Sequence, residues 1–213
     1  AGPEEPAASP KLAEMATAAM ADPNRVEPRL SKAEKLRRAE AYLLKTSRPL
    51  HTAVIRGQLN QINQLLTLGA DVQEADERGM LPLNYAVLLD NLPAVRLLLQ
   101  KGADLNRLDA NGMFWEMLGI WGWGHTIGTE AGWGTLHYAV AAGSQTALEL
   151  LIKKGADVNQ AEKEYQKTPI FMALQVERPA MLKTLLDAGA NLKHMDKQGE
   201  TLFHSMARQD KID

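Results

Sequence analysis

Apolar residues recur along most of this chain in a pattern with a period near 33 residues. Each period holds two short stretches in which apolar side chains follow helical spacing. The first stretch opens on a variant of T-P-L-H, and the second closes on a variant of L-L-x-x-G-A-D. Opening stretches lie at 48–57, 81–90, 134–143, 168–177 and 201–207, and closing stretches lie at 65–72, 98–106, 151–159 and 185–192. The pattern predicts a row of helix pairs, each followed by a turn.

Prolines and glycines mark the expected helix ends. Three openings place proline in a first helical turn, where its missing amide costs nothing: Pro49, Pro82 and Pro169. A glycine suited to a left-handed cap follows each second helix: Gly69, Gly102, Gly155 and Gly189. These glycines are 33, 53 and 34 residues apart. The third unit therefore contains about twenty extra residues, which we assign to 113–133.

These motifs resemble those of the ankyrin-repeat family, and the resemblance covers residues 48–207. It implies an all-α solenoid of about four to five units, with first helices lining a concave face and turns projecting as fingers. It also implies that the histidines of the T-P-L-H position make hydrogen bonds within and between repeats: His51, His137 and His204. The sequence departs from the motif at Leu81, Asn84 and Phe171, and the third unit lacks the proline.

The N-terminal region differs in composition from the repeats. Residues 1–10 are small, polar and proline-rich, so we expect a disordered tether. Residues 11–46 are expected to form a helical cap on the repeats of 47–213, with helices at 11–21 and 31–44. Ser31 and Glu34 form a capping box for the second of these. A chain that starts at Ala1 fits a mature terminus left by a signal peptidase, and we expect a periplasmic or envelope-associated protein, with the cytoplasm as the alternative.

Composition narrows the classes of partner. A formal net charge of −2 gives no basic face for nucleic acid. The longest apolar run, 113–123, is too short to span a bilayer, so membrane contact is not expected. The chain has no cysteine, which excludes disulfides and thiolate metal sites.

The sequence contains few motifs that would indicate an enzyme. The five histidines show no ligand spacing, so no metal site is expected. No nucleophile elbow or Walker loop occurs, and no cofactor is expected. The one enzymatic alternative is an active site around His125, Thr126 and Glu130 in the extra segment. Two sets of carboxylates are expected to organise the turns: Asp71, Asp104 and Asp157 after the capping glycine, then Asp76, Asp109 and Asp196.

The extra segment carries all four tryptophans of the chain, at 115, 121, 123 and 133. Long loops in compact arrays are usually functional or disordered, and tryptophan is typical of binding hot spots. One reading makes these residues exposed anchors for a partner, with one or two buried as struts. The other reading makes the segment a structural loop packed on the neighbouring repeat.

Candidate binding residues come from three places. On the first helices, the concave positions are Ile55, Arg56, Leu88 and Leu89, then Ala141, Ala142, Gln175 and Val176. The finger tips contribute Arg78, Arg107, Asn111 and Tyr165. The extra segment contributes Phe114, Trp115, Trp121, Trp123, His125 and Trp133. Leu88 and Leu89 are too apolar for a bare surface, so either the extra segment covers them or they form a patch for a partner.

The sequence thus predicts a non-enzymatic module, monomeric on its own, that binds a folded protein. A small stand-alone array of this kind resembles bacterial inhibitors or immunity proteins that neutralise a toxin or secreted effector enzyme. The alternative is a cytoplasmic scaffold or adaptor whose loop is purely structural.

Overall fold

The computed structural model describes residues 48–77, 79–109 and 132–209. The predicted tether and cap lie outside these residues. So do seven of the candidate binding residues: Arg78, Asn111, Phe114, Trp115, Trp121, Trp123 and His125.

Within the described residues the chain consists of helices joined by turns, as predicted. The helices are α3 (Pro49–Ile55), α4 (Leu59–Thr67), α5 (Pro82–Leu88), α6 (Leu92–Gln100), α8 (Thr135–Ala142), α9 (Gln145–Lys153), α10 (Pro169–Gln175), α11 (Pro179–Asp187) and α12 (Leu202–Gln209). None of them is long and apolar enough to cross a lipid bilayer.

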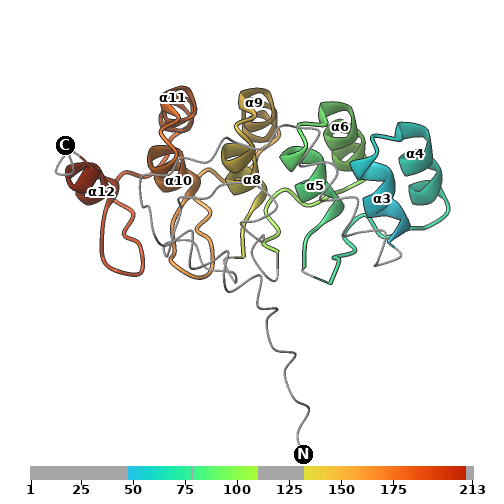
Figure 1. Cartoon of the computed structure of the whole chain (residues 1–213), viewed down its shortest axis with the longest axis horizontal. Coiled ribbons are helices and arrows are strands. Elements are labelled where there is room, and N and C mark those ends of the chain that lie inside the picture. Colours follow the sequence, from blue (N-terminus) through green and yellow to red (C-terminus); the bar gives the residue numbers. More distant parts are fainter. Residues whose placement is uncertain (1–47, 78, 110–131, 210–213) are drawn as a thin grey trace, which may run out of the picture.

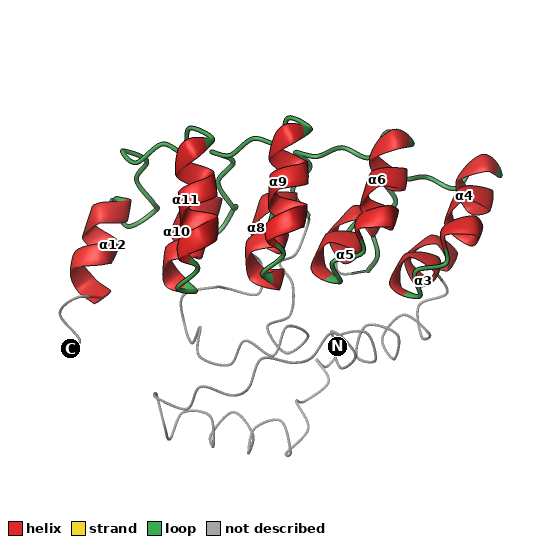
Figure 2. Ribbon diagram, turned by 90° about the horizontal axis from the view of Figure 1, so that it is seen from above, coloured by secondary structure: helices red, strands yellow, loops and turns green. Residues whose placement is uncertain are grey.

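The helix pairs stand side by side in one row. In Figure 1 the second helices α4, α6, α9 and α11 form an upper layer, and the first helices lie below them. Figure 2 shows the same row from above. α5 packs against its own partner α6 and against the neighbouring first helices α3 and α8. One pair cannot bury its apolar face alone, so the core runs continuously through the stack.

Residues at equivalent positions in successive units are buried in this core. The residue after the opening proline position is buried in four units: Leu50, Leu83, Leu136 and Ile170. The fifth unit places Phe203 there, and Phe203 is 59% exposed. No second helix follows α12 among the described residues, which explains why its core position is open.

The carboxylates predicted to organise the turns do so. Asp71, Asp104 and Asp157 each accept a hydrogen bond from the backbone N–H two residues on. Deeper in each finger, Asp76 Oδ1 accepts from Met80 N at 2.9 Å, and Asp196 Oδ1 accepts from Glu200 N at 2.9 Å. We number each finger by the unit whose helices follow it. In the fourth finger, which precedes α10, Glu162 takes this role, since its Oε1 accepts from Lys167 N at 2.9 Å; the sequence pattern did not single this residue out.

In the first and third units the histidine of the opening motif links neighbouring repeats, as the resemblance implied, whereas the bonds of His204 are with Thr201 in its own turn. His51 Nε2 lies 3.1 Å from Met80 O, and His137 Nε2 lies 3.1 Å from Lys167 O. His137 Nδ1 accepts from Gly134 N, so the imidazole is neutral and Nε2 donates. Burial lowers the pKa of His137 to about 4, which keeps it neutral. Asn84 replaces this histidine in the second unit, and among the described residues neither polar atom of its side chain has a hydrogen-bond partner.

The junction between the two helices of a unit requires a left-handed residue. Gly57 and Gly143 meet this need with φ of 67° and 74°. Asp90 and Glu177 occupy the same position in their units with φ of 53° and 51°. A side chain with a Cβ is strained in this region, by about 1–2 kcal/mol. The Asp90 carboxylate accepts a hydrogen bond from Ser144, which offsets part of its strain.

We expect Glu177→Gly to stabilise the protein by about 0.5–1 kcal/mol, because relief of strain exceeds the added chain entropy. Urea unfolding followed by circular dichroism measures the change. Asp90→Gly is the matched control and should gain less, because it also loses the contact with Ser144. A destabilised Glu177→Gly variant would contradict the strain argument.

Candidate functional site

The third finger is closed at its base in the same way as the second. Asp109 N donates to Trp133 O at 3.1 Å, and Trp133 N donates to Asp109 Oδ1 at 2.8 Å. Asp76 and Met80 make the same pair of bonds, at 2.9 Å each. Trp133 therefore occupies the position of Met80, and Gly132 that of Gly79.

This register locates the extra residues. Two residues separate Asp76 from Gly79, whereas residues 110–131 separate Asp109 from Gly132. The additional chain thus leaves and re-enters between the two halves of an ordinary finger. Gly132 and Trp133, which sequence analysis placed in the extra segment at 113–133, are parts of the repeat itself.

Lys163 of the fourth finger braces both ends of this base. Its ammonium donates to Asp109 O at 3.0 Å. Its aliphatic stem crosses Gly132, where an added Cβ would lie 2.5 Å from the Lys163 Cδ. Asn106 and Asp157 tie the same two fingers together, since Asp157 N donates to Asn106 Oδ1 at 2.9 Å. The base is therefore fixed relative to the fourth unit.

Asp109 is a buried acidic side chain in this base. It is 1% exposed, and the Tyr138 hydroxyl donates to its Oδ2. Burial raises the pKa of Asp109 to about 7, although the hydrogen bonds from Tyr138 and Trp133 and the nearby Lys163 favour the charged form. The carboxyl of Asp109 is thus far easier to protonate than that of an exposed aspartate.

Trp133 is a core residue of the third unit. It is 3% exposed and packs edge-on against Tyr138, with ring centroids 5.4 Å apart. Its ring centroid lies 6.4 Å from that of His137. Of the four tryptophans it is the one that the structure describes, and it is a buried strut rather than an exposed anchor.

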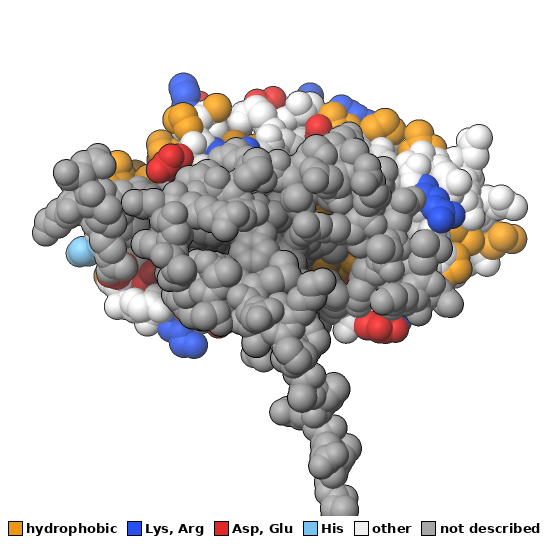
Figure 3. Space-filling model, viewed as in Figure 1, with side chains coloured by type: hydrophobic (Ala, Val, Ile, Leu, Met, Phe, Trp, Pro, Cys, Tyr) orange, Lys and Arg blue, Asp and Glu red, His pale blue; other side chains and the backbone are white. Residues whose placement is uncertain are grey.

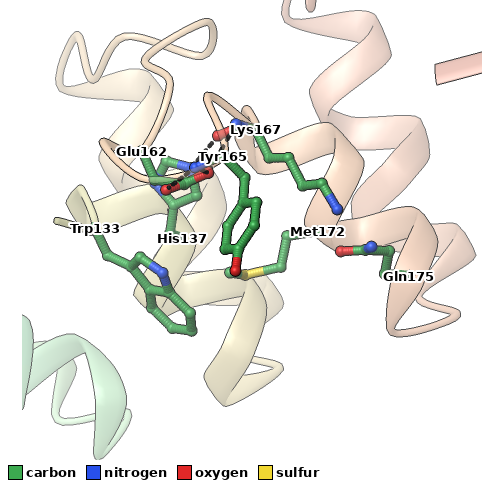
Figure 4. Close-up of a pocket in the computed structure, with 7 residues that line it drawn as sticks. All are labelled: Trp133, His137, Glu162, Tyr165, Lys167, Met172 and Gln175. Atoms are coloured by element: carbon green, nitrogen blue, oxygen red, sulfur yellow. Dashed lines mark hydrogen bonds between the residues drawn. The ribbon is translucent and has the colours of Figure 1, made fainter. Parts of the chain in front are cut away.

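A narrow crevice opens beside Trp133, between α8, α10 and the fourth finger. Its volume is about 10 Å³, and it is lined by Trp133, His137, Glu162, Tyr165, Lys167, Met172 and Gln175. Figure 4 shows the ring of Tyr165 between Trp133 and Met172. Glu162 accepts backbone hydrogen bonds from Glu164, Tyr165 and Lys167, so its charge is already satisfied. The Lys167 ammonium lies 5.8 Å from the centroid of the Tyr165 ring.

The structure separates the remaining candidate residues into accessible and buried groups. Arg56 and Arg107 are exposed, and the Arg107 guanidinium donates to Gln73 O at 3.0 Å. Tyr165 is part-exposed at the crevice. In contrast, Ile55, Leu88 and Leu89 are only 3–4% exposed.

Leu88 and Leu89 are therefore buried and form no free apolar patch, while the segment that was expected to cover them lies outside the described residues. Ile55 is likewise part of the core. Nothing in the repeat motif brings Glu162, Lys167 and Met172 together, so the sequence did not predict them as neighbours of one crevice. Gln175 was placed on the concave side by its position in the unit.

The described residues contain no cluster of three or more histidines and carboxylates able to hold a metal ion. His125, Thr126 and Glu130, the enzymatic alternative, lie outside the described residues.

Among known protein families, the chain matches the ankyrin repeats. The model for ankyrin repeats (three copies) matches residues 17–109 and 116–212. The match begins inside the segment predicted as an N-terminal cap.

Curated relatives match over shorter stretches. Ankyrin repeat and SOCS box protein 6 of Mus musculus is 37% identical over 79 residues, which is 36% of this chain and 19% of that protein. Putative ankyrin repeat protein L371 of Acanthamoeba polyphaga mimivirus is 37% identical over 76 residues, 36% of this chain and 10% of the relative. Rabankyrin-5 of Mus musculus is 35% identical over 92 residues, 37% of this chain and 8% of the relative. The chain thus matches less than a fifth of the length of these relatives, and the likeness is one of repeats rather than of whole proteins.

Asp109→Asn tests the buried charge, because asparagine mimics the protonated acid at all pH values. The pKa of Asp109 is raised in the folded state, so its contribution to stability is full below about 4 and is lost as the pH rises through about 7. We expect the stability of the parent, relative to Asp109→Asn, to fall between pH 4 and 7 by at most about 1.4 kcal/mol per unit.

Denaturant unfolding of both proteins across this range measures the difference. His137 titrates in the same range with the opposite sign, but it is present in both proteins and cancels. A difference that stays constant with pH would show that Asp109 ionises as in a free peptide.

Proposed function

This chain belongs to the ankyrin-repeat family, whose repeats are protein-interaction modules, and we propose that it binds a folded protein without catalysing a reaction. The contact surface in this proposal comprises the finger tips and the extra segment of the third finger. Leu88, Leu89 and Ile55 are no longer part of it, because they are buried.

The main support for this proposal is the hydrogen-bonded base of the third finger. The bonds between Asp109 and Trp133 close the finger, and Lys163 holds both ends from the next unit. Residues 110–131 leave from this base, and their sequence contains Phe114 and three tryptophans. Binding residues are often carried by loops on a rigid scaffold, and tryptophan is enriched at hot spots.

The charges around the fingers favour a protein partner over a polyanion. Exposed side chains there have both signs, for example Glu77, Arg107 and Lys163. In Figure 3, Lys and Arg side chains and Asp and Glu side chains are scattered around the rim rather than gathered by sign. Mixed charges suit the polar rim of a protein interface.

A more specific form of this proposal is that binding inhibits the partner. In it, the extra segment fills the cleft of a toxin or secreted effector enzyme, and the protein acts as an inhibitor or immunity protein in the periplasm or envelope. The support is that an aromatic-rich segment is anchored at one point of the finger side. The competing version is a cytoplasmic adaptor whose extra segment only packs on its own repeat.

Replacing residues 110–131 by Glu-Arg, the pair that joins Asp76 to Gly79, separates these versions. We expect the helical circular dichroism to persist and the free energy of unfolding to stay equal or rise by up to about 2 kcal/mol, because the shorter loop costs less entropy to close. A protein captured on the immobilised parent and confirmed by calorimetry should bind the replaced variant at least about tenfold more weakly.

Lys183→Ala is the control and should bind like the parent, since Lys183 is exposed and lies on α11, in the helix layer opposite the fingers (Figure 1). If the replaced variant unfolds more easily by several kcal/mol, the segment is structural. If it keeps both its stability and its affinity, the segment is not the binding site. Inhibition of the captured protein by the parent but not by the replaced variant supports the narrower version.

A further inference from the structure

One side chain of the fourth finger contacts both residues between which residues 110–131 are attached. The Lys163 ammonium donates to Asp109 O at 3.0 Å. Its stem lies against Gly132, where an added Cβ would be 3.0 Å from the Lys163 Cβ, 2.7 Å from its Cγ and 2.5 Å from its Cδ. Lys163 therefore acts on the exit and on the return of the chain at the same time.

The backbone of Lys163 is itself held in place by the fourth finger. The preceding residue, Glu162, is 4% exposed and accepts hydrogen bonds from the backbone N–H groups of Glu164 and Tyr165. The side chain of Gln166 donates to Lys163 O at 3.2 Å. Because this backbone is fixed, the contacts of the Lys163 side chain tie the base of the third finger to the position of the fourth.

The second finger is tied to the third in a different place. Arg107 donates to Gln73 O at 3.0 Å, and the side chain of Gln73 donates to Gly102 O at 3.3 Å. Both bonds are made at exposed residues that come before the base in the sequence. Lys163, in contrast, contacts the two attachment points themselves, so the base follows the fourth finger more closely than the second.

We propose that Lys163 is a positioning residue for the binding segment: from the fourth finger, it sets the direction in which residues 110–131 leave the third. A segment whose exit is fixed in advance loses less freedom when it binds, and this raises its affinity for a partner. The role rests on the proposed function, because the direction of the segment matters only if the segment contacts a partner.

Hydrogen exchange tests whether Lys163 holds the base. The backbone N–H groups of Asp109 and Trp133 make the two bonds that close it. We expect Lys163→Ala to lower the protection of both groups by about tenfold, because the open base no longer loses the lysine contacts. Met80 N–H makes the same bond in the second finger and should keep its protection. Lys197→Ala, at the same place in the fifth finger, is the matched control and should change neither finger.

Spin-label distances test the direction of the exit. The chain has no cysteine, so labels attach only where a cysteine is introduced. Ala131→Cys places one label beside Gly132, and Lys183→Cys places the other on the exposed surface of α11. We expect a narrow distance distribution in the parent, one at least about twofold broader with Lys163→Ala, because the freed chain samples more directions, and a narrow one again with Lys163→Arg. Labels at Lys101→Cys and Lys183→Cys check that the array is intact and should give the same distance in every variant.

The other outcomes overturn the proposal. A distribution that stays narrow with Lys163→Ala means that Lys163 does not position the segment. Faster exchange of Met80 N–H together with that of Trp133 means that Lys163 only stabilises the array. A distribution that stays broad with Lys163→Arg means that the cation and its stem are not what fixes the exit. Both measurements are made without a partner, so these failures leave partner binding through residues 110–131 standing, and a failure of that binding leaves the measured distances standing.

Discussion

Each finger of this array depends on one buried acidic side chain that holds its two halves together. Asp76, Asp109, Glu162 and Asp196 stand at the same position in successive units, and each accepts hydrogen bonds from backbone N–H groups across the turn. A buried carboxylate is costly unless such donors satisfy it. The backbone N–H groups that donate to the acidic side chain are therefore held in place. The residues between these donors are not required for these bonds, so their number can vary.

This constraint explains how the third unit accepts a long segment without losing its register. The bonds between Asp109 and Trp133 repeat those between Asp76 and Met80, so the helices on both sides keep their places. Closing the longer loop costs only about 2 kcal/mol in chain entropy, because that cost grows with the logarithm of length. Lys163 adds a hydrogen bond and packing at the same base, which offset part of it.

The sequence predicted the parts of the fold that depend on single residues. Prolines at helix starts, capping glycines and the turn carboxylates have local causes, and the structure confirms them. The register of the third finger has no such local cause. Gly112 and Gly132 both suit the finger glycine in sequence, and only the bonds between Asp109 and Trp133 select Gly132. The burial of Leu88 and Leu89 was left open by the sequence, because periodicity alone does not say whether a position on the first helices is covered.

Two of the departures from the repeat pattern lie next to or within the third finger. Asn84 breaks the row of inter-repeat histidine bonds in the unit before it, and Trp133 replaces the smaller Met80 within it. A sequence selected for stability alone keeps such positions regular, and local exceptions are typical of functional places. Trp133 serves two parts of this unit. Its backbone closes the base from which residues 110–131 leave, and its indole packs in the core beside the crevice, so the position of the extra segment and the packing of the third unit depend on the same residue.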